Sequence, residues 1–293
     1  MAASIDELLK RVRRLEIRAR RLVSESLSGE YHSSFKGQGL DFDDFRPYQA
    51  GDDPRFIDWN VSARFDSPHI RQFREERELT VILALDLSAS ADYGSAEKTK
   101  RELAAELAAL LGFSASHNGD KTGLLLFSGE PLLYLPPKKG PAHILRLLRE
   151  TLATPSAGQP TSLATAARFL HRTLPRRSLV FLISDFIDWG FEKPLSTLAR
   201  QHELIALQTI DPVEKDLPDA GRVLLRDAES GHLIDLNTSN PNVRMGYQKL
   251  SRRYREGLRA FFKKNAVDHL EVPTTGDYLP ALHRLLKQRA RRH

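Results

Sequence analysis

The segment with the clearest chemical potential is Asp-Leu-Ser-Ala-Ser, in which Asp86, Ser88 and Ser90 alternate directly after an apolar run at 79–86. Alternate residues that leave a strand can converge where the chain curls, which would gather one carboxylate and two hydroxyls. Carboxylate, hydroxyl and water oxygens are the ligands that hard cations prefer. A purely structural interpretation competes with this one, because Ser and Asp after a strand are common helix caps and turn formers.

Two further polar segments favour the metal-binding interpretation. Ser184 and Asp185 end a second apolar run at 177–185, and the loop Gly-Gln-Pro-Thr-Ser-Leu at 158–163 opens a predicted helix. Continuous apolar runs are typical of strands buried on both faces of a parallel sheet. In such sheets ligands bind at the carboxyl ends of the strands, near a topological switch point. We therefore expect the three segments to meet and to bind one divalent cation, Mg²⁺ before Mn²⁺ or Ca²⁺.

The elements that must position these segments alternate between strand and helix from residue 79 onward. This alternation predicts an α/β protein with a doubly wound, mainly parallel sheet and helices on both faces. The expected strands are 79–86, 121–129, 131–136, 177–185, 203–210 and 267–273, the third of them antiparallel. The expected helices are 96–119, 140–152, 161–174, 190–201, 241–265 and 276–290. Two short apolar runs, 221–227 and 231–237, predict a β-hairpin.

Composition narrows the functional classes. The 293 residues carry a net charge of +6, with 41% hydrophobic and 28% charged residues, as in a globular protein and not a disordered one. The absence of cysteine excludes disulfides, thiolate nucleophiles and iron–sulfur clusters. The mild basicity predicts no nucleic-acid partner, and no apolar run is long enough to span a membrane. Without a signal-like leader, a cytoplasmic location is expected.

Three regions are expected along the chain. Residues 1–27 form a basic amphipathic helix, whose aliphatic stripe predicts docking on its own domain ahead of binding to a membrane, a nucleic acid or an acidic partner. Residues 28–78 are rich in aromatics, Trp59 above all, that should pack on the core. Residues 79–293 form the main domain, with a hairpin insertion at about 211–240.

The combination of Asp-x-Ser-x-Ser, the Thr-bearing loop and the Ser-Asp strand end resembles a von Willebrand factor A-like domain. This resemblance implies a Rossmann-like fold with a metal-ion-dependent adhesion site. Its ligand set would be Asp86, Ser88, Ser90, Thr161 and Asp185, with Asp185 acting through water.

The flanking sequence is similar to a narrower bacterial family, called domain of unknown function fifty-eight. The matching strings are Ser-Phe-Lys-Gly-Gln-Gly at 34–39, Phe-Arg-Pro-Tyr at 45–48 and Gly-Asp-Asp-Pro-Arg-Phe-Ile-Asp-Trp at 51–59. The resemblance implies a protein without assigned enzymatic activity that works with a MoxR-type AAA+ ATPase, in a chaperone-like or cofactor-insertion system. Many relatives carry transmembrane helices near the N-terminus, and this chain is expected to be a soluble member.

Two functional classes follow from these observations. In the first, the cation has an open coordination position that accepts a carboxylate from a protein partner, so that the protein is an adaptor and not an enzyme. In the second, the cation activates water for hydrolysis of phosphoesters. The sequence favours the first, because it contains no HExxH motif, no nucleophile elbow and no histidine in the site loops.

Overall fold

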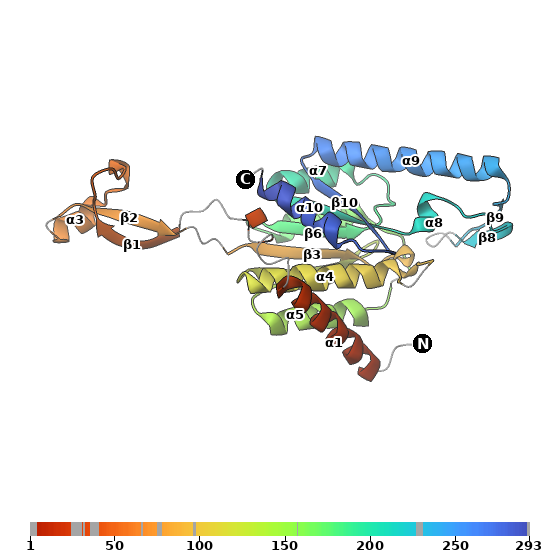
Figure 1. The fold of residues 1–293 in the computed structure, drawn as a ribbon, viewed down its shortest axis with the longest axis horizontal. Coiled ribbons are helices and arrows are strands. Elements are labelled where there is room, and N and C mark those ends of the chain that lie inside the picture. Colours follow the sequence, from red (N-terminus) through yellow and green to blue (C-terminus); the bar gives the residue numbers. More distant parts are fainter. Residues whose placement is uncertain are drawn as a thin grey trace.

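The computed structural model describes residues 5–24, 31, 33–35, 41–65, 67–74, 78–95, 98–156, 158–226 and 231–291. A six-stranded sheet forms the centre, in the order β10-β7-β6-β3-β4-β5 (Figure 1). Its strands are β3 (Thr80–Asp86), β4 (Lys121–Phe127), β5 (Pro131–Lys138), β6 (Leu179–Ser184), β7 (Glu203–Ile210) and β10 (Asp268–Pro273). Five strands are parallel, and β5 pairs antiparallel with β4. The mixed α/β class with a mainly parallel sheet is as predicted.

Helices cover both faces of this sheet because its strands are apolar on both faces. In β3, alternate side chains enter opposite cores: Leu83 and Leu85 contribute to one, Ile82 and Ala84 to the other. The first core is covered by α1 (Ile5–Leu22), α4 (Lys100–His117), α5 (Pro141–Ala153) and α10 (Leu279–Ala290). The second is covered by α6 (Leu163–Thr173), α7 (Glu192–Gln201) and α9 (Pro241–Lys264).

The N-terminal helix α1 docks on its own domain, as its aliphatic stripe predicted. Val12 and Ala19 are buried in the first core, beside α4 and α5. Its basic face is partly paired with acidic residues of α4, since Arg18 forms an ion pair of 2.9 Å with Glu106. Apolar burial and charge complementarity thus hold the helix in one place.

The region after α1 divides into two parts with different surroundings. Tyr31 and Phe35 are buried in the first core, and the Phe35 ring lies 6.0 Å from that of Phe181. In contrast, β1 (Asp41–Pro47) and β2 (His69–Arg74) form an antiparallel pair that, with η2 (Pro54–Phe56) and α3 (Trp59–Phe65), lies beyond one end of the sheet (Figure 1).

The expectation that Trp59 packs on the sheet is wrong. Its exposed fraction is 70%, and that of Phe65 is 62%. The β1–β2 unit satisfies its polar groups locally: Arg46 donates to both carboxylate oxygens of Asp52, at 2.7 and 2.8 Å, and Asp58 accepts from the first backbone amides of α3. The boundaries proposed for the three regions remain predictions.

The C-terminal part contains the predicted hairpin, β8 (Arg222–Arg226) and β9 (Leu233–Asn237), preceded by the short helix α8 (Pro212–Lys215). Three segments named in the sequence analysis lie outside the described residues: the hairpin turn at 228–230, the motif residues 36–39, and residues 25–27 of the predicted N-terminal helix. Across the described ranges, no helix is both long and apolar enough to cross a membrane.

Candidate metal centre

The sheet topology brings the two acidic strand ends together. From β3 the chain moves to β4 on one side, and it later returns to β6 on the other side of β3. The carboxyl ends of β3 and β6 therefore lie next to each other at the switch point, where ligands bind in sheets of this kind. Asp86 ends β3 and Asp185 follows β6, and each is only 5% exposed.

The Asp86 carboxylate accepts three hydrogen bonds at this edge. Its Oδ2 accepts hydrogen bonds from the hydroxyls of Thr161, at 2.9 Å, and Ser184, at 2.6 Å. Its Oδ1 accepts from the backbone amide of Ser88, at 2.9 Å. Thr161 precedes α6, so one carboxylate joins segments from β3, β6 and the α6 loop, as the sequence predicted.

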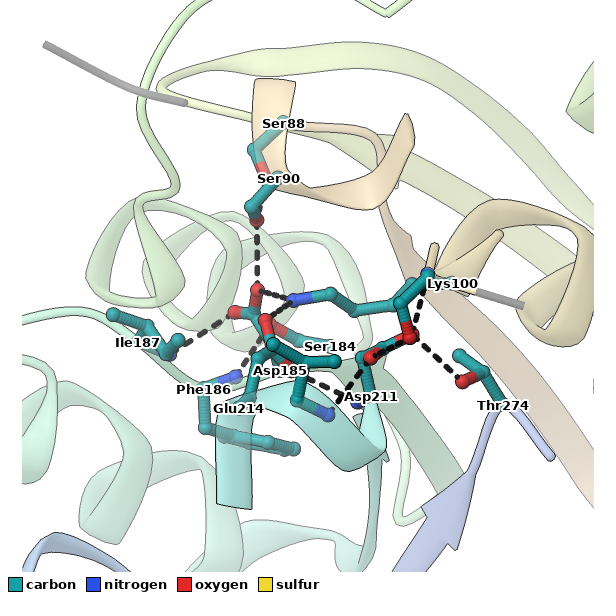
Figure 2. Close-up of polar contacts among 12 residues, drawn as sticks. Ser88, Ser90, Lys100, Ser184, Asp185, Phe186, Ile187, Asp211, Glu214 and Thr274 are labelled. Carbon is teal, nitrogen blue, oxygen red and sulfur yellow. Dashed lines mark hydrogen bonds and ion pairs between the residues drawn. The ribbon is translucent and has the colours of Figure 1, made fainter. Parts of the chain in front are cut away.

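The hydroxyls after β3 connect Asp86 to Asp185. The chain turns through the short helix η3 (Ala89–Asp92), which places the Ser88 and Ser90 hydroxyl oxygens 3.1 Å apart. Ser90 then donates to Asp185 Oδ2 at 2.7 Å (Figure 2). The structure thus gathers all five predicted residues in one continuous network, completed by Thr161.

A buried lysine at the same site was not predicted. Lys100 begins α4, is 2% exposed, and its Nζ donates to Asp185 Oδ2 at 2.8 Å and to Glu214 of α8 (Figure 2). A signal for it exists in the sequence, since Lys100 lies three and four positions before Leu103 and Ala104. Those residues are on the buried face of α4, so the spacing places the lysine on the same face.

Glu214 and Asp211 form a second layer around Lys100 that sequence reasoning also missed. Asp211 accepts hydrogen bonds from Ser95, through its amide at 2.8 Å and its hydroxyl at 2.5 Å, and from the hydroxyl of Thr274 at 3.0 Å. Its backbone amide donates to Glu214 Oε2 at 2.9 Å, within a capping box of α8. Although burial acts to raise the pKa of Asp211, the hydrogen bonds from Ser95 and Thr274 lower it overall.

The site carries more negative charge than its lysine can balance. Burial, reinforced by the charge of Asp185, raises the pKa of Asp86 to about 6. Burial also raises the pKa of Glu214, although Lys100 opposes this. For Lys100 itself, burial acts to lower the pKa, but Asp185 and Glu214 outweigh it and raise the pKa. When Asp86, Asp185, Glu214 and Lys100 are all ionised, three carboxylates face one ammonium, which leaves at least two uncompensated negative charges before Asp211 is counted.

The donor set fits a hard divalent cation. Two uncompensated charges match the charge of such an ion, and the available ligands are carboxylate and hydroxyl oxygens. A small cavity lined by Asp86, Ser90, Lys100 and Asp185 leaves space for about one water molecule. No three His, Cys, Asp or Glu side chains converge on a metal position within the described ranges, so a cation here would depend on the hydroxyls of Ser88, Ser90 and Thr161.

Comparison with known protein families shows to which family the chain belongs. The family described as "Protein of unknown function DUF58" matches residues 44–257, which is most of the sequence. The chain belongs to the DUF58 family. This agrees with the resemblance of the flanking motifs, and β3, β6 and the five predicted site residues lie inside the matched range.

Related proteins extend the comparison over nearly the whole chain. The uncharacterized protein Rv1480 of Mycobacterium tuberculosis is 33% identical over 290 residues, which cover 97% of this chain and 90% of that protein. The uncharacterized protein MAV169 of Mycobacterium avium is 32% identical over 162 residues, covering 54% of this chain and 94% of its own.

Two solved structures align with the chain at 18% sequence identity. An aerotolerance-related membrane protein from Bacteroides fragilis aligns with a TM-score of 0.49, covering 73% of this chain and 100% of its own. The hypothetical protein BatB from Bacteroides thetaiotaomicron aligns with a TM-score of 0.45, covering 73% of this chain and 99% of its own.

Proposed function

We propose that this DUF58 protein is a metal-dependent protein–protein interaction module whose cation is held by Asp86, Ser88, Ser90 and Thr161, with Asp185 acting through water. The observation that carries the proposal is the excess of two negative charges in a network that joins β3, β6 and the α6 loop. A divalent ion, Mg²⁺ before Mn²⁺ or Ca²⁺, would neutralise that excess. The arrangement supports the von Willebrand factor A-like interpretation of the fold, which we extend here to its adhesion chemistry.

The proposed partner contributes an acidic side chain to the ion. Asp86 supplies one direct carboxylate, and Asp185 is already engaged by Lys100 and Ser90. Because only one carboxylate binds the ion directly, the open coordination position of the ion still favours a further anionic oxygen, even though the ion and the surrounding site together are close to neutral. An Asp or Glu from a partner protein would complete its coordination, and the contact would gain strength as the interface excludes water.

We further propose that the partner is a MoxR-type AAA+ ATPase, as the family resemblance implies. The protein would act as an adaptor or co-chaperone in complex assembly or cofactor insertion. Such an ATPase would supply the chemical energy, and its need for ATP makes the cytoplasm the proposed place of action.

The contacts favour this function over a metal-dependent phosphoester hydrolase. A hydrolase needs a general base near the ion to take a proton from water. The carboxylates around the proposed ion position are held by other donors: Asp185 by Lys100 and Ser90, and Asp211 by Ser95 and Thr274. We therefore propose that the protein has no enzymatic activity of its own.

Titration calorimetry tests the metal site directly. The wild-type protein is expected to bind one Mg²⁺ or Mn²⁺ ion, and Asp86→Ala is expected to lose measurable binding. Asp92→Ala is the matched control, because Asp92 lies in the same turn but is exposed and faces Arg101 at 3.7 Å. Unchanged affinity in Asp86→Ala would overturn the site.

A pull-down with a purified MoxR-type ATPase from the same organism tests the partner. Binding is expected in Mg²⁺, and it should be lost in EDTA and in Asp86→Ala and weakened in Ser88→Ala. If EDTA and Asp86→Ala leave binding intact, the metal is not part of the interface. If the protein is instead a hydrolase, an activity assay should detect metal-dependent hydrolysis of phosphoesters.

A further inference from the structure

An exposed apolar surface lies directly beside the metal-site network. In the segment that follows Asp185, Ile187 is 47% exposed and Trp189 is 82% exposed. Exposed apolar side chains that lie together in one patch, with polar residues at its rim, mark interaction sites more often than singly exposed ones do. Tryptophan is also among the residue types most enriched at the energetic centres of protein interfaces.

This segment is held in one conformation by its neighbours. The Ile187 amide donates to Asp185 Oδ1 at 3.1 Å (Figure 2). Asp188 Oδ2 accepts from the Leu163 amide of α6 at 2.8 Å. Phe186 adopts a positive φ of 61°, which is rare for a residue with a side chain, and its buried ring packs edge-on against Phe262 at 5.2 Å. A fixed segment loses little conformational entropy when it binds a partner.

Helix α9 extends the apolar surface. The Tyr254 ring lies 6.2 Å from that of Trp189, and the Tyr254 hydroxyl donates to the carbonyl of Phe186. Leu250, four positions earlier on the same helix face, is 69% exposed. On its inner side, α9 is anchored beside the site, since Ser251 donates to the Glu214 carbonyl at 2.8 Å.

The same helix is strongly basic. Its 24 residues include eight Lys or Arg and a single acidic residue, Glu256. Lys249 and Arg253 are both exposed and follow the helical row next to Leu250 and Tyr254. An apolar strip bordered by positive charge is complementary to an acidic peptide that carries a large apolar side chain.

We propose that the surface formed by Ile187, Trp189, Lys249, Leu250, Arg253 and Tyr254, the Trp189 surface, binds an acidic segment of the partner protein. An apolar side chain of the segment packs on Trp189 and Tyr254, and its acidic residues face Lys249 and Arg253. This inference rests on the proposed function in one respect, because the same segment is expected to supply the carboxylate that completes the coordination of the cation. A single polypeptide segment fits better than a phosphate polyanion, because only the peptide can also supply an apolar side chain to cover the exposed Trp189 and Leu250.

Tryptophan fluorescence gives a direct readout, because the chain contains only two tryptophans, Trp59 and Trp189. In Trp59→Phe the emission comes from Trp189 alone, and in Trp189→Phe it comes from Trp59, which lies in the separate β1–β2 unit. The probes are short random peptides displayed on phage and selected on the Mg²⁺-loaded full-length protein. Selected peptides are expected to be rich in Asp and Glu around one large apolar residue, and to shift the emission of Trp59→Phe but not of Trp189→Phe.

Matched variants measure the contribution of each part. Trp189→Ala is expected to weaken the selected peptides at least about 10-fold, whereas Trp59→Ala leaves their affinity unchanged. The double charge reversal Lys249→Glu/Arg253→Glu is expected to lower the affinity of the selected peptides by a similar factor. Arg13→Glu/Arg14→Glu, which changes net charge equally on exposed positions of α1, should have little effect.

The outcomes separate this inference from the proposed function. The Trp189 surface is overturned if no peptides are enriched, if they are not acidic, or if Trp189→Ala binds them normally. It is also overturned if polyuridylate RNA or phosphatidylserine vesicles, and not peptides, shift the Trp189 emission. If Trp189→Ala lowers the affinity of the peptides while EDTA and Asp86→Ala leave it unchanged, the Trp189 surface is supported and the cation-dependent function is refuted.

Discussion

Replacement of Lys100 by methionine is the sharpest test of the charge balance at the site. Methionine retains most of the length of the lysine stem, so the change removes mainly the ammonium. That ammonium contacts Asp185 at 2.8 Å and also contacts Glu214, with side-chain exposures of 2% for Lys100, 4% for Asp185 and 21% for Glu214. Removing one partner of a buried ion pair costs about 3–5 kcal/mol, because the other charge stays buried without compensation.

We therefore expect Lys100→Met to lower the free energy of unfolding by about 4 kcal/mol in EDTA. This is a large part of the roughly 5–15 kcal/mol that stabilises a typical domain. Urea unfolding followed by circular dichroism measures the loss. A bound divalent ion would replace part of the missing positive charge, so millimolar Mg²⁺ should stabilise Lys100→Met more than it stabilises the wild type. A tenfold gain in Mg²⁺ affinity corresponds to about 1.4 kcal/mol.

Lys98→Met is the matched control. Lys98 lies two residues earlier and pairs with Glu106 at 2.9 Å, but its side chain is 25% exposed. A partly solvated pair of this kind is worth about 1 kcal/mol or less, with no dependence on Mg²⁺. An equal loss for Lys100→Met in EDTA and in Mg²⁺, with unchanged Mg²⁺ affinity, would refute the idea that Lys100 and a cation share the same carboxylates.

Two further predictions concern regions outside the site. Burial lowers the pKa of His269 to about 4, with Glu271 opposing the shift and Arg259 adding to it. The folded state therefore disfavours the protonated ring, and stability should fall by up to about 3 kcal/mol as the pH drops from about 6.5 to about 4. His269→Gln should show a smaller fall over this range in urea unfolding, and an identical pH profile would contradict the assignment. Replacement of residues 41–74 by a short Gly/Ser linker should leave the melting temperature and monomeric state of the remaining protein nearly unchanged, because Asp41 and Arg74 are paired across β1 and β2. Aggregation of that variant would show that the β1–β2 unit covers the core after all.

The main domain is predictable from sequence because its signals are local. The run at 79–86 is apolar at consecutive positions, which only a strand buried on both faces satisfies well, and the structure places β3 at Thr80–Asp86 with both faces covered. Helix α4 begins at a capping box formed by Thr99 and Glu102 and ends near Asn118 and Gly119, which are standard signals at helix ends. The short hairpin of β8 and β9 follows from two apolar runs separated by a few polar residues.

The region around Trp59 shows where the same reasoning fails. Aromatic content predicts burial somewhere, but composition does not say against which surface. The paired β1 and β2 strands, the Arg46–Asp52 pair and the cap of α3 complete a small unit by themselves. Phe56, Trp59 and Phe65 of that unit remain exposed, whereas Tyr31 and Phe35, only a short distance earlier, enter the main core.

By itself, the sequence determined the α/β class, the two acidic strand ends and the set of oxygen-bearing side chains after β3, since each depends on residues close together in the chain. Only the tertiary structure decided how these charges are balanced. Asp185 follows Lys100 by 85 positions in the sequence, and Glu214 follows it by 114. Their contact depends on the strand order and on the placement of α8 against α4, and the energy of such a buried cluster depends on distances and solvent exclusion that no local pattern contains.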